Sequence, residues 1–116
     1  MKWKKAPDQL VSLLADRMKG VECEYKKMFG YPAYFINGNM FAGLHGDKVF
    51  LRLSDSEIKR FREEQPEAKL LEPVPGRIMS SYVVLPESVY SNEECFNLWL
   101  DSSVKYVSSL PKKQRR

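Results

Sequence analysis

The dipeptide Asn37-Gly38 stands between two apolar runs, and it limits the fold of this chain more than any other feature. Residues 33–36 precede it and residues 40–44 follow it. Asn and Gly both tolerate the positive φ angles of a tight hairpin turn. We therefore expect the two runs to pair as an antiparallel hairpin.

Further strands extend this hairpin in both directions. The turn signal at residues 45–47 leads into a strand over residues 48–53, and residues 23–29 alternate as a strand. Later in the chain we expect a strand over residues 78–85 and a short one over residues 69–71. These runs predict an antiparallel meander plus an additional strand.

Helices are predicted on both sides of the meander in sequence. Residues 8–19 begin at a capping Asp8 and end at Gly20. Their apolar residues recur at helical spacing and form one stripe: Leu10, Leu13, Leu14 and Met18. The stripe predicts a helix that packs on the core.

Two capping boxes mark later helices. Ser54 and Glu57 are spaced to bond each other's backbone N–H, and this helix should end before Pro66. It should bury Ile58 and Phe61. The run Ser91-Asn92-Glu93-Glu94 opens a long helix that reaches about residue 109, with an apolar face of Phe96, Trp99, Leu100 and Val107.

The length and composition suit one domain of the α+β class. A chain of 116 residues with 43% hydrophobic residues can form a core of its own. We expect an antiparallel β-sheet flanked by N-terminal and C-terminal α-helices over residues 8–110. We expect a basic tail on each side of this domain, over residues 1–7 and over residues 111–116.

The net charge of +4 is concentrated at the two ends. Seven basic residues lie there: Lys2, Lys4, Lys5, Lys112, Lys113, Arg115 and Arg116. The rest of the chain has twelve Lys or Arg against fifteen Asp or Glu, so its balance is acidic. The tails are read either as solvated ends or as a source of salt-dependent attraction to phosphates.

The two cysteines favour a reducing compartment. Cys23 and Cys95 are far apart, whereas a secreted domain of this size usually has several disulfides. The first ten residues lack the apolar segment of a signal peptide, and no stretch is long enough to span a bilayer. We expect a cytoplasmic protein without membrane contact.

The residues for catalysis or cofactor binding are sparse. His45, the one histidine, falls in a predicted turn, and the cysteines have no metal-ligand spacing. No glycine-rich phosphate loop is present. We expect neither an enzyme nor a metal or cofactor site, although a thiol-dependent activity at Cys95 remains a third hypothesis.

Several short motifs, in this order and spacing, resemble the amino-terminal domain of TfoX/Sxy proteins. The resemblance covers about residues 8–110 and rests on the runs 27–31, 34–42, 49–53 and 76–82, with Leu85-Pro86-Glu87 before the last helix. It implies an α+β fold and a bacterial transcriptional coactivator of natural competence. The chain would be a stand-alone domain, without the carboxy-terminal domain of the full-length regulators.

Strand alternation divides the meander into two faces. Phe35 should pair with Met40 and Tyr34 with Phe41 across the Asn37-Gly38 turn. The face toward the helices therefore carries Ala33, Phe35, Met40, Ala42, Leu44, Val49, Leu51 and Leu53. The opposite face then carries Tyr34, Ile36, Asn39, Phe41, Lys48, Phe50 and Arg52.

The candidate binding residues come from this second face: Tyr34, Phe41, Lys48, Phe50 and Arg52. Aromatic and basic side chains together suit a protein interface, including a homodimer. They also suit the stacking of nucleic acid bases, and a helix of the same chain could cover them instead. The main hypothesis is a non-enzymatic regulatory domain that binds a protein, and the alternative is a nucleic-acid-binding domain.

Overall fold

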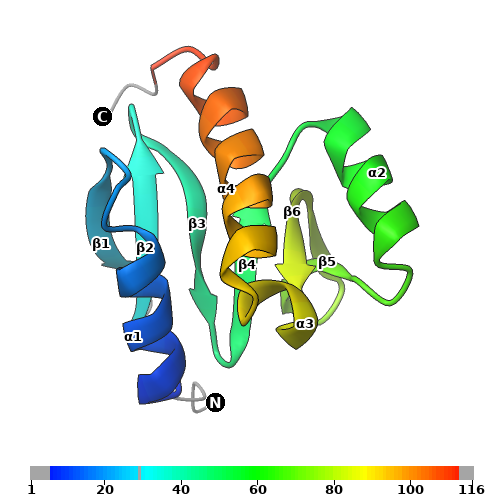
Figure 1. The fold of residues 1–116 in the computed structure, drawn as a ribbon, viewed down its shortest axis with the longest axis horizontal. Coiled ribbons are helices and arrows are strands. Elements are labelled where there is room, and N and C mark those ends of the chain that lie inside the picture. Colours follow the sequence, from blue (N-terminus) through cyan, green and yellow to red (C-terminus); the bar gives the residue numbers. More distant parts are fainter. Residues whose placement is uncertain (1–5, 29, 113–116) are drawn as a thin grey trace.

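The protein is one antiparallel sheet with helices on one of its faces (Figure 1). A computed structural model describes residues 6–28 and 30–112, so most of each predicted basic tail lies outside the described residues. The elements are, in order, α1 (Asp8–Arg17), β1 (Glu24–Met28), β2 (Tyr31–Ile36), β3 (Asn39–His45), β4 (Lys48–Arg52), α2 (Asp55–Glu64), β5 (Leu70–Val74), β6 (Arg77–Leu85), α3 (Glu87–Tyr90) and α4 (Glu93–Ser108). The predicted α+β class is confirmed.

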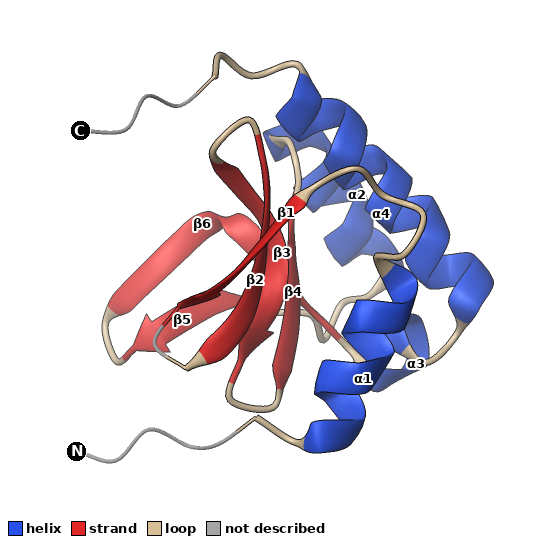
Figure 2. Ribbon diagram, turned by 90° about the vertical axis from the view of Figure 1, so that its left-hand side faces the viewer, coloured by secondary structure: helices blue, strands red, loops and turns tan. Residues whose placement is uncertain are grey.

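The six strands are ordered β1-β2-β3-β4-β6-β5, and every neighbouring pair is antiparallel. Seen from the side, the helices form one layer and the sheet another (Figure 2). None of the described helices covers the second face of the sheet, which we call the open face. The face packed against the helices is the helix face.

The predicted hairpin at Asn37-Gly38 is confirmed. Asn37 has φ 52° and Gly38 has φ 79°, the positive values that a two-residue turn of this kind needs. Ile36 pairs with Asn39 directly across the turn, and Phe35 pairs with Met40.

The pairing beyond these residues is not regular, because β3 contains a β-bulge. Tyr34 pairs with Ala42, so Phe41 is an extra residue without a partner opposite it. A single inserted residue exchanges the two faces of a strand. Phe41 and Ala42 consequently both pack in the main core, and the bulged carbonyl of Phe41 accepts a hydrogen bond from Ser103 Oγ of α4 at 3.3 Å.

The bulge makes part of the face prediction wrong. The assignment is right for β3 from Ala42 onward and for all of β4, whose Val49 and Leu51 are 1% and 0% exposed in the main core. It is reversed for the residues nearer the turn and for β2. Ala33, Phe35 and Met40 belong to the open face, whereas Tyr34, Ile36, Asn39 and Phe41 belong to the helix face.

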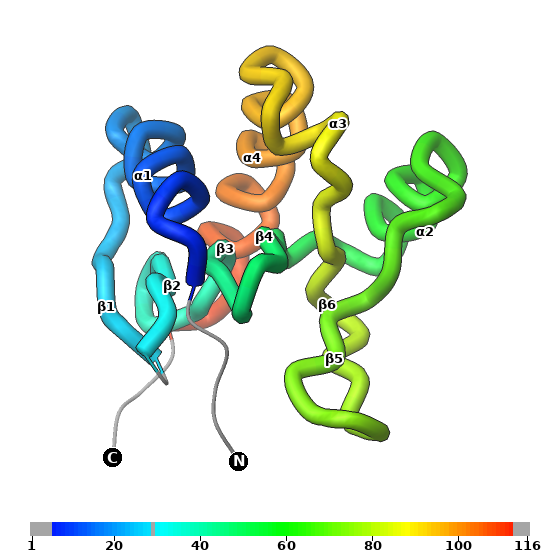
Figure 3. Tube along the Cα trace, turned by 90° about the horizontal axis from the view of Figure 1, so that it is seen from below, coloured from blue at the N-terminus to red at the C-terminus, as the bar shows by residue number. Residues whose placement is uncertain are grey.

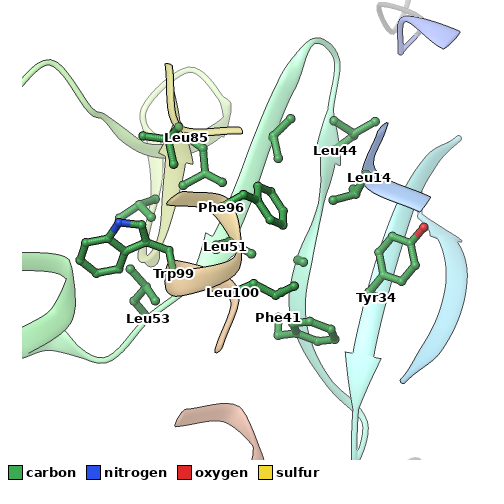
Figure 4. Packing of buried hydrophobic residues seen from close by; sticks show 14 of the residues in the cluster. Leu14, Tyr34, Phe41, Leu44, Leu51, Leu53, Leu85, Phe96, Trp99 and Leu100 are labelled. Carbon is green, nitrogen blue, oxygen red and sulfur yellow. The ribbon is translucent and has the colours of Figure 1, made fainter. Parts of the chain in front are cut away.

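The main core lies between the sheet and the helices (Figure 4). Leu14 of α1 and Phe96 and Leu100 of α4 are buried against it. Phe61 of α2 meets Trp99 of α4 edge to face, with 4.9 Å between the ring centroids. The predicted apolar residues of α2 and α4 are therefore the ones that bury these helices. At α1 the core residues are Leu10, Val11, Leu14 and Met18, with Val11 where the prediction had Leu13.

The helix starts follow the sequence with two corrections. Ser54 caps α2 as predicted, since its side chain accepts the Glu57 N–H at 3.3 Å. At α4 the cap is Asn92 and not Ser91, because a separate helical turn, α3, already occupies residues 87–90. At α1 the cap position is Pro7, so Asp8 is the first helical residue.

Candidate binding groove

The five predicted binding residues do not form one surface. Tyr34 and Phe41 are 6% and 0% exposed and belong to the main core, because the bulge turns them toward the helices. Lys48, Phe50 and Arg52 do share the open face. The prediction that all five side chains share one face of the sheet is therefore wrong.

Phe50 is buried within a second, smaller core on the open face. It is 3% exposed and packs with Leu71 and Tyr82, while Met40, Met79 and Val84 surround them. The rings of Phe50 and Tyr82 meet edge to face at 5.5 Å. The Tyr82 hydroxyl donates a hydrogen bond to the Met40 carbonyl at 3.0 Å, which joins β6 to β3.

The hairpin formed by β5 and β6 brings Leu71 and Met79 over this small core. Its register shifts twice, between Leu70 and Leu71 and again between Leu71 and Val74. Bulges bend a strand and increase its twist. The bent hairpin projects from the sheet on the side away from the helices (Figure 3).

The curved sheet encloses a groove of about 430 Å³ on the open face. Strands β1 and β2 form one wall, and the β5–β6 hairpin forms the other (Figure 3). The lining is mostly apolar: Met28, Tyr31, Pro32, Ala33, Met40, Leu44, His45, Phe50, Leu71, Pro73, Val74, Arg77 and Met79. This volume is typical of ligand-binding pockets.

Gly43 lies between two residues that line the groove, since it pairs with Phe50 on β4 and with Ala33 on β2. A Cβ atom at position 43 would lie 2.8 Å from the ring of Phe50 and 2.8 Å from the Pro32 carbonyl oxygen. The hydrogen side chain of glycine lets the Phe50 ring pack closely against β3. The shape of the groove thus depends on this glycine.

Several apolar side chains remain accessible at the walls. Met28 and Val74 are 38% and 37% exposed, and Met40 and Met79 are half-buried. Methionine is unbranched and polarizable, so it adapts to irregular apolar partners. Exposed methionine and valine around a concave floor suit the binding of apolar side chains of another molecule.

Sequence reasoning missed the wall formed by the β5–β6 hairpin. The sequence predicted strands over residues 69–71 and 78–85 within and after a proline-bearing loop over residues 67–76, whereas β5 reaches Val74 and β6 begins at Arg77. A usable signal was present, since Pro75-Gly76 is a dipeptide typical of turns. Gly76 adopts a φ of 85° at this turn.

The charged groups of the open face are held in different ways. Arg52 lies between the rings of Tyr82 and Tyr106, with 5.8 Å from its guanidinium carbon to each ring centroid. Lys48 forms an ion pair of 3.7 Å with Asp47. Burial raises the pKa of the Tyr82 hydroxyl, and the charge of Arg52 acts against this shift.

Charge is segregated between the two layers. The helices have ten Asp or Glu against five Lys or Arg, whereas the strands have five Lys or Arg against two Asp or Glu. The acidic balance expected for the body of the chain therefore belongs to the helix layer. The sheet, which forms the groove, is basic.

His45 in the groove should make stability depend on pH. Burial lowers the pKa of its imidazole from 6.5, and the charge of Lys48 adds to this shift. The unfolded chain then binds more protons, so the stabilising contribution is present above about pH 6.5 and is lost as the pH falls below it. We expect the melting temperature to fall between pH 7 and pH 5 by more in the wild type than in a His45→Gln variant. An equal fall in both would contradict this assignment.

Residues 6–28 and 30–112 contain neither a membrane-spanning helix nor a cluster of metal-binding side chains. No helix in this part of the chain is both long and apolar enough to cross a bilayer. No cluster of three or more metal-binding side chains occurs in it. Both cysteines are free thiols and half-buried.

Comparison with known proteins yields one family. The model of the family described as the TfoX N-terminal domain matches residues 13–107, which is nearly the whole chain. The chain matches no curated protein and no solved structure.

Proposed function

Since the chain belongs to the TfoX N-terminal domain family, we propose that it is a non-enzymatic regulatory domain that acts by binding another protein in its groove. The resemblance to TfoX/Sxy regulators supports the regulatory role. The observation that carries the binding role is the apolar groove on the open face, with Met28 and Val74 exposed at its walls. Contiguous apolar surface that remains exposed is typical of interaction sites.

The side chains of the groove favour a protein over a nucleic acid. Base stacking needs accessible aromatic rings, but Phe50 and Tyr82 are 3% and 8% exposed. What is accessible instead is thioether and aliphatic surface, which suits apolar side chains. The basic sheet supports the alternative, a nucleic-acid-binding domain, only through non-specific attraction to phosphates.

A photo-crosslinking amino acid at position 74 tests the proposal directly. Val74 is exposed at the groove wall, so the replacement should leave the fold intact. In cells that express the chain naturally, irradiation should produce a discrete protein adduct. The adduct should resist nuclease and disappear with protease.

The matched control places the same amino acid at Leu98. This residue is 70% exposed on α4, in the helix layer. The same adduct from both positions would contradict the proposal, because it would show that the partner contacts the chain without preference for the groove. An adduct that nuclease removes would support the nucleic-acid alternative instead.

A further inference from the structure

The proposed function leaves open what kind of protein segment enters the groove. We infer that it is a short segment with apolar side chains and flanking Asp or Glu residues, drawn from a different protein. This inference rests on the proposed function and adds the chemistry of the partner. It is carried by two cations, Arg77 in the lining of the groove and Lys26 on the neighbouring part of β1, with which no described carboxylate forms an ion pair.

Lys26 is the cation of the first wall. It lies on β1 opposite Ala33, which lines the groove, and two residues before Met28, which also lines it. Alternation therefore places its side chain on the open face. Its Nζ lies 5.7 Å from the centroid of the Phe35 ring, and the residue is exposed.

Arg77 is the cation of the second wall. It begins β6, pairs with Val74 across the hairpin, and lines the groove directly. It is exposed. Neither Arg77 nor Lys26 forms an ion pair with any residue in the described part of the chain.

The carboxylates nearest these two cations do not form ion pairs with them among the described residues. Glu72 accepts the backbone N–H of Gly76 at 2.7 Å, so it closes the turn of its own hairpin. Glu24 shares the face of Lys26 and lies two residues from it, about 7 Å along the strand, but the two side chains form no ion pair. Asp47 is occupied by Lys48. The groove thus presents an apolar floor between two positive walls.

The same charges disfavour a second copy of this chain as the occupant. A symmetric dimer places the same surface of each copy against the other. Groove against groove would bring Lys26 and Arg77 of the two copies together, and like charges at an interface repel. A partner with carboxylates beside its apolar side chains meets no such cost and gains two charge pairs.

A phage library of random 16-residue peptides tests the inference directly, because the selection itself reveals which chemistry the groove accepts. The library is selected on the wild-type chain after clearance on a Val74→Asp variant, whose added carboxylate spoils the groove wall. The enriched peptides should combine at least three apolar residues with a net negative charge. Synthetic copies with a fluorescent label then give dissociation constants by anisotropy.

Charge reversal on the protein supplies the matched comparison. The double variant Lys26→Glu, Arg77→Glu should bind the enriched peptides at least about tenfold more weakly, with a loss that shrinks at high salt. The double variant Lys59→Glu, Lys105→Glu makes the same change in net charge on the helix layer, at exposed positions, and should bind as the wild type does.

The outcomes separate the two proposals. Groove-dependent peptides without an acidic excess, or affinities that the Lys26 and Arg77 reversals leave unchanged, would overturn the inference and leave the proposed function standing. If no peptide depends on the groove, while a fluorescent single-stranded oligonucleotide does, the proposed function itself fails. A wild-type dimer in light scattering that Val74→Asp dissociates would make a second copy the occupant and overturn the inference.

Discussion

Replacing Phe41 by alanine should lower the free energy of unfolding by about 3–5 kcal/mol. The side chain is fully buried beneath α4, where Leu100 lies beside it (Figure 4). Truncation removes the ring from the centre of the main core and leaves a cavity that the sheet and α4 cannot close. Urea denaturation followed by circular dichroism would measure the loss.

Phe35→Ala is the matched control. Phe35 is an aromatic residue of the same hairpin, but it is half-buried on the open face. Phe35→Ala should lower the free energy of unfolding by less than half as much as Phe41→Ala does, because part of the Phe35 ring is already exposed to water. Regular alternation predicts the opposite order, with Phe35 in the core and Phe41 outside. Equal or reversed losses would therefore contradict the bulge at Phe41.

Gly43→Ala should destabilise the protein by about 1–3 kcal/mol, although it adds only one methyl group. The new Cβ would lie 2.8 Å from both the Phe50 ring and the Pro32 carbonyl oxygen. The ring must move away, and the carbonyl belongs to the backbone of β2 and yields little. Thermal and urea unfolding would measure the cost, and the methyl and aromatic NMR signals of the groove would report the displaced ring.

Gly20→Ala separates this steric cost from the general effect of the substitution. A Cβ at position 20 meets no atom within 4 Å. The change should be neutral or stabilising by up to about 1 kcal/mol, because it restricts the unfolded chain. Adding Phe50→Leu to Gly43→Ala should shift the groove signals less than Gly43→Ala alone does. If Gly43→Ala were as harmless as Gly20→Ala, Phe50 would not be packed against Gly43.

Local signals in the sequence account for most of the elements. Asn37-Gly38 determines a turn because its two residues accept a conformation that others resist, and this holds whatever surrounds it. Ser54 caps α2 through atoms three residues away. The apolar stripe containing Phe96 and Trp99 identifies the buried face of α4 for the same reason, since helical spacing repeats within a few residues.

The residues of the candidate groove were harder to predict, because the face of each residue depends on counting through the bulge. Up to Phe41 every residue is locally compatible with a regular strand. One extra residue then turns Tyr34 inward and Ala33 outward. No turn or capping signal marks the position of the bulge, because the bulge is stabilised by contacts with residues that are distant in the sequence. The Phe41 ring packs in the core, and its carbonyl accepts a hydrogen bond from Ser103.

The amino-acid sequence by itself determined the fold class, the meander and the buried faces of the helices, because these follow from the conformations and spacings of neighbouring residues. Only the tertiary structure decided which side chains line the groove. Met28, Met40 and Val74 come from three separate strands, and two irregular pairings set how the sheet curves around them. Such curvature arises from packing between distant segments, which local patterns do not encode.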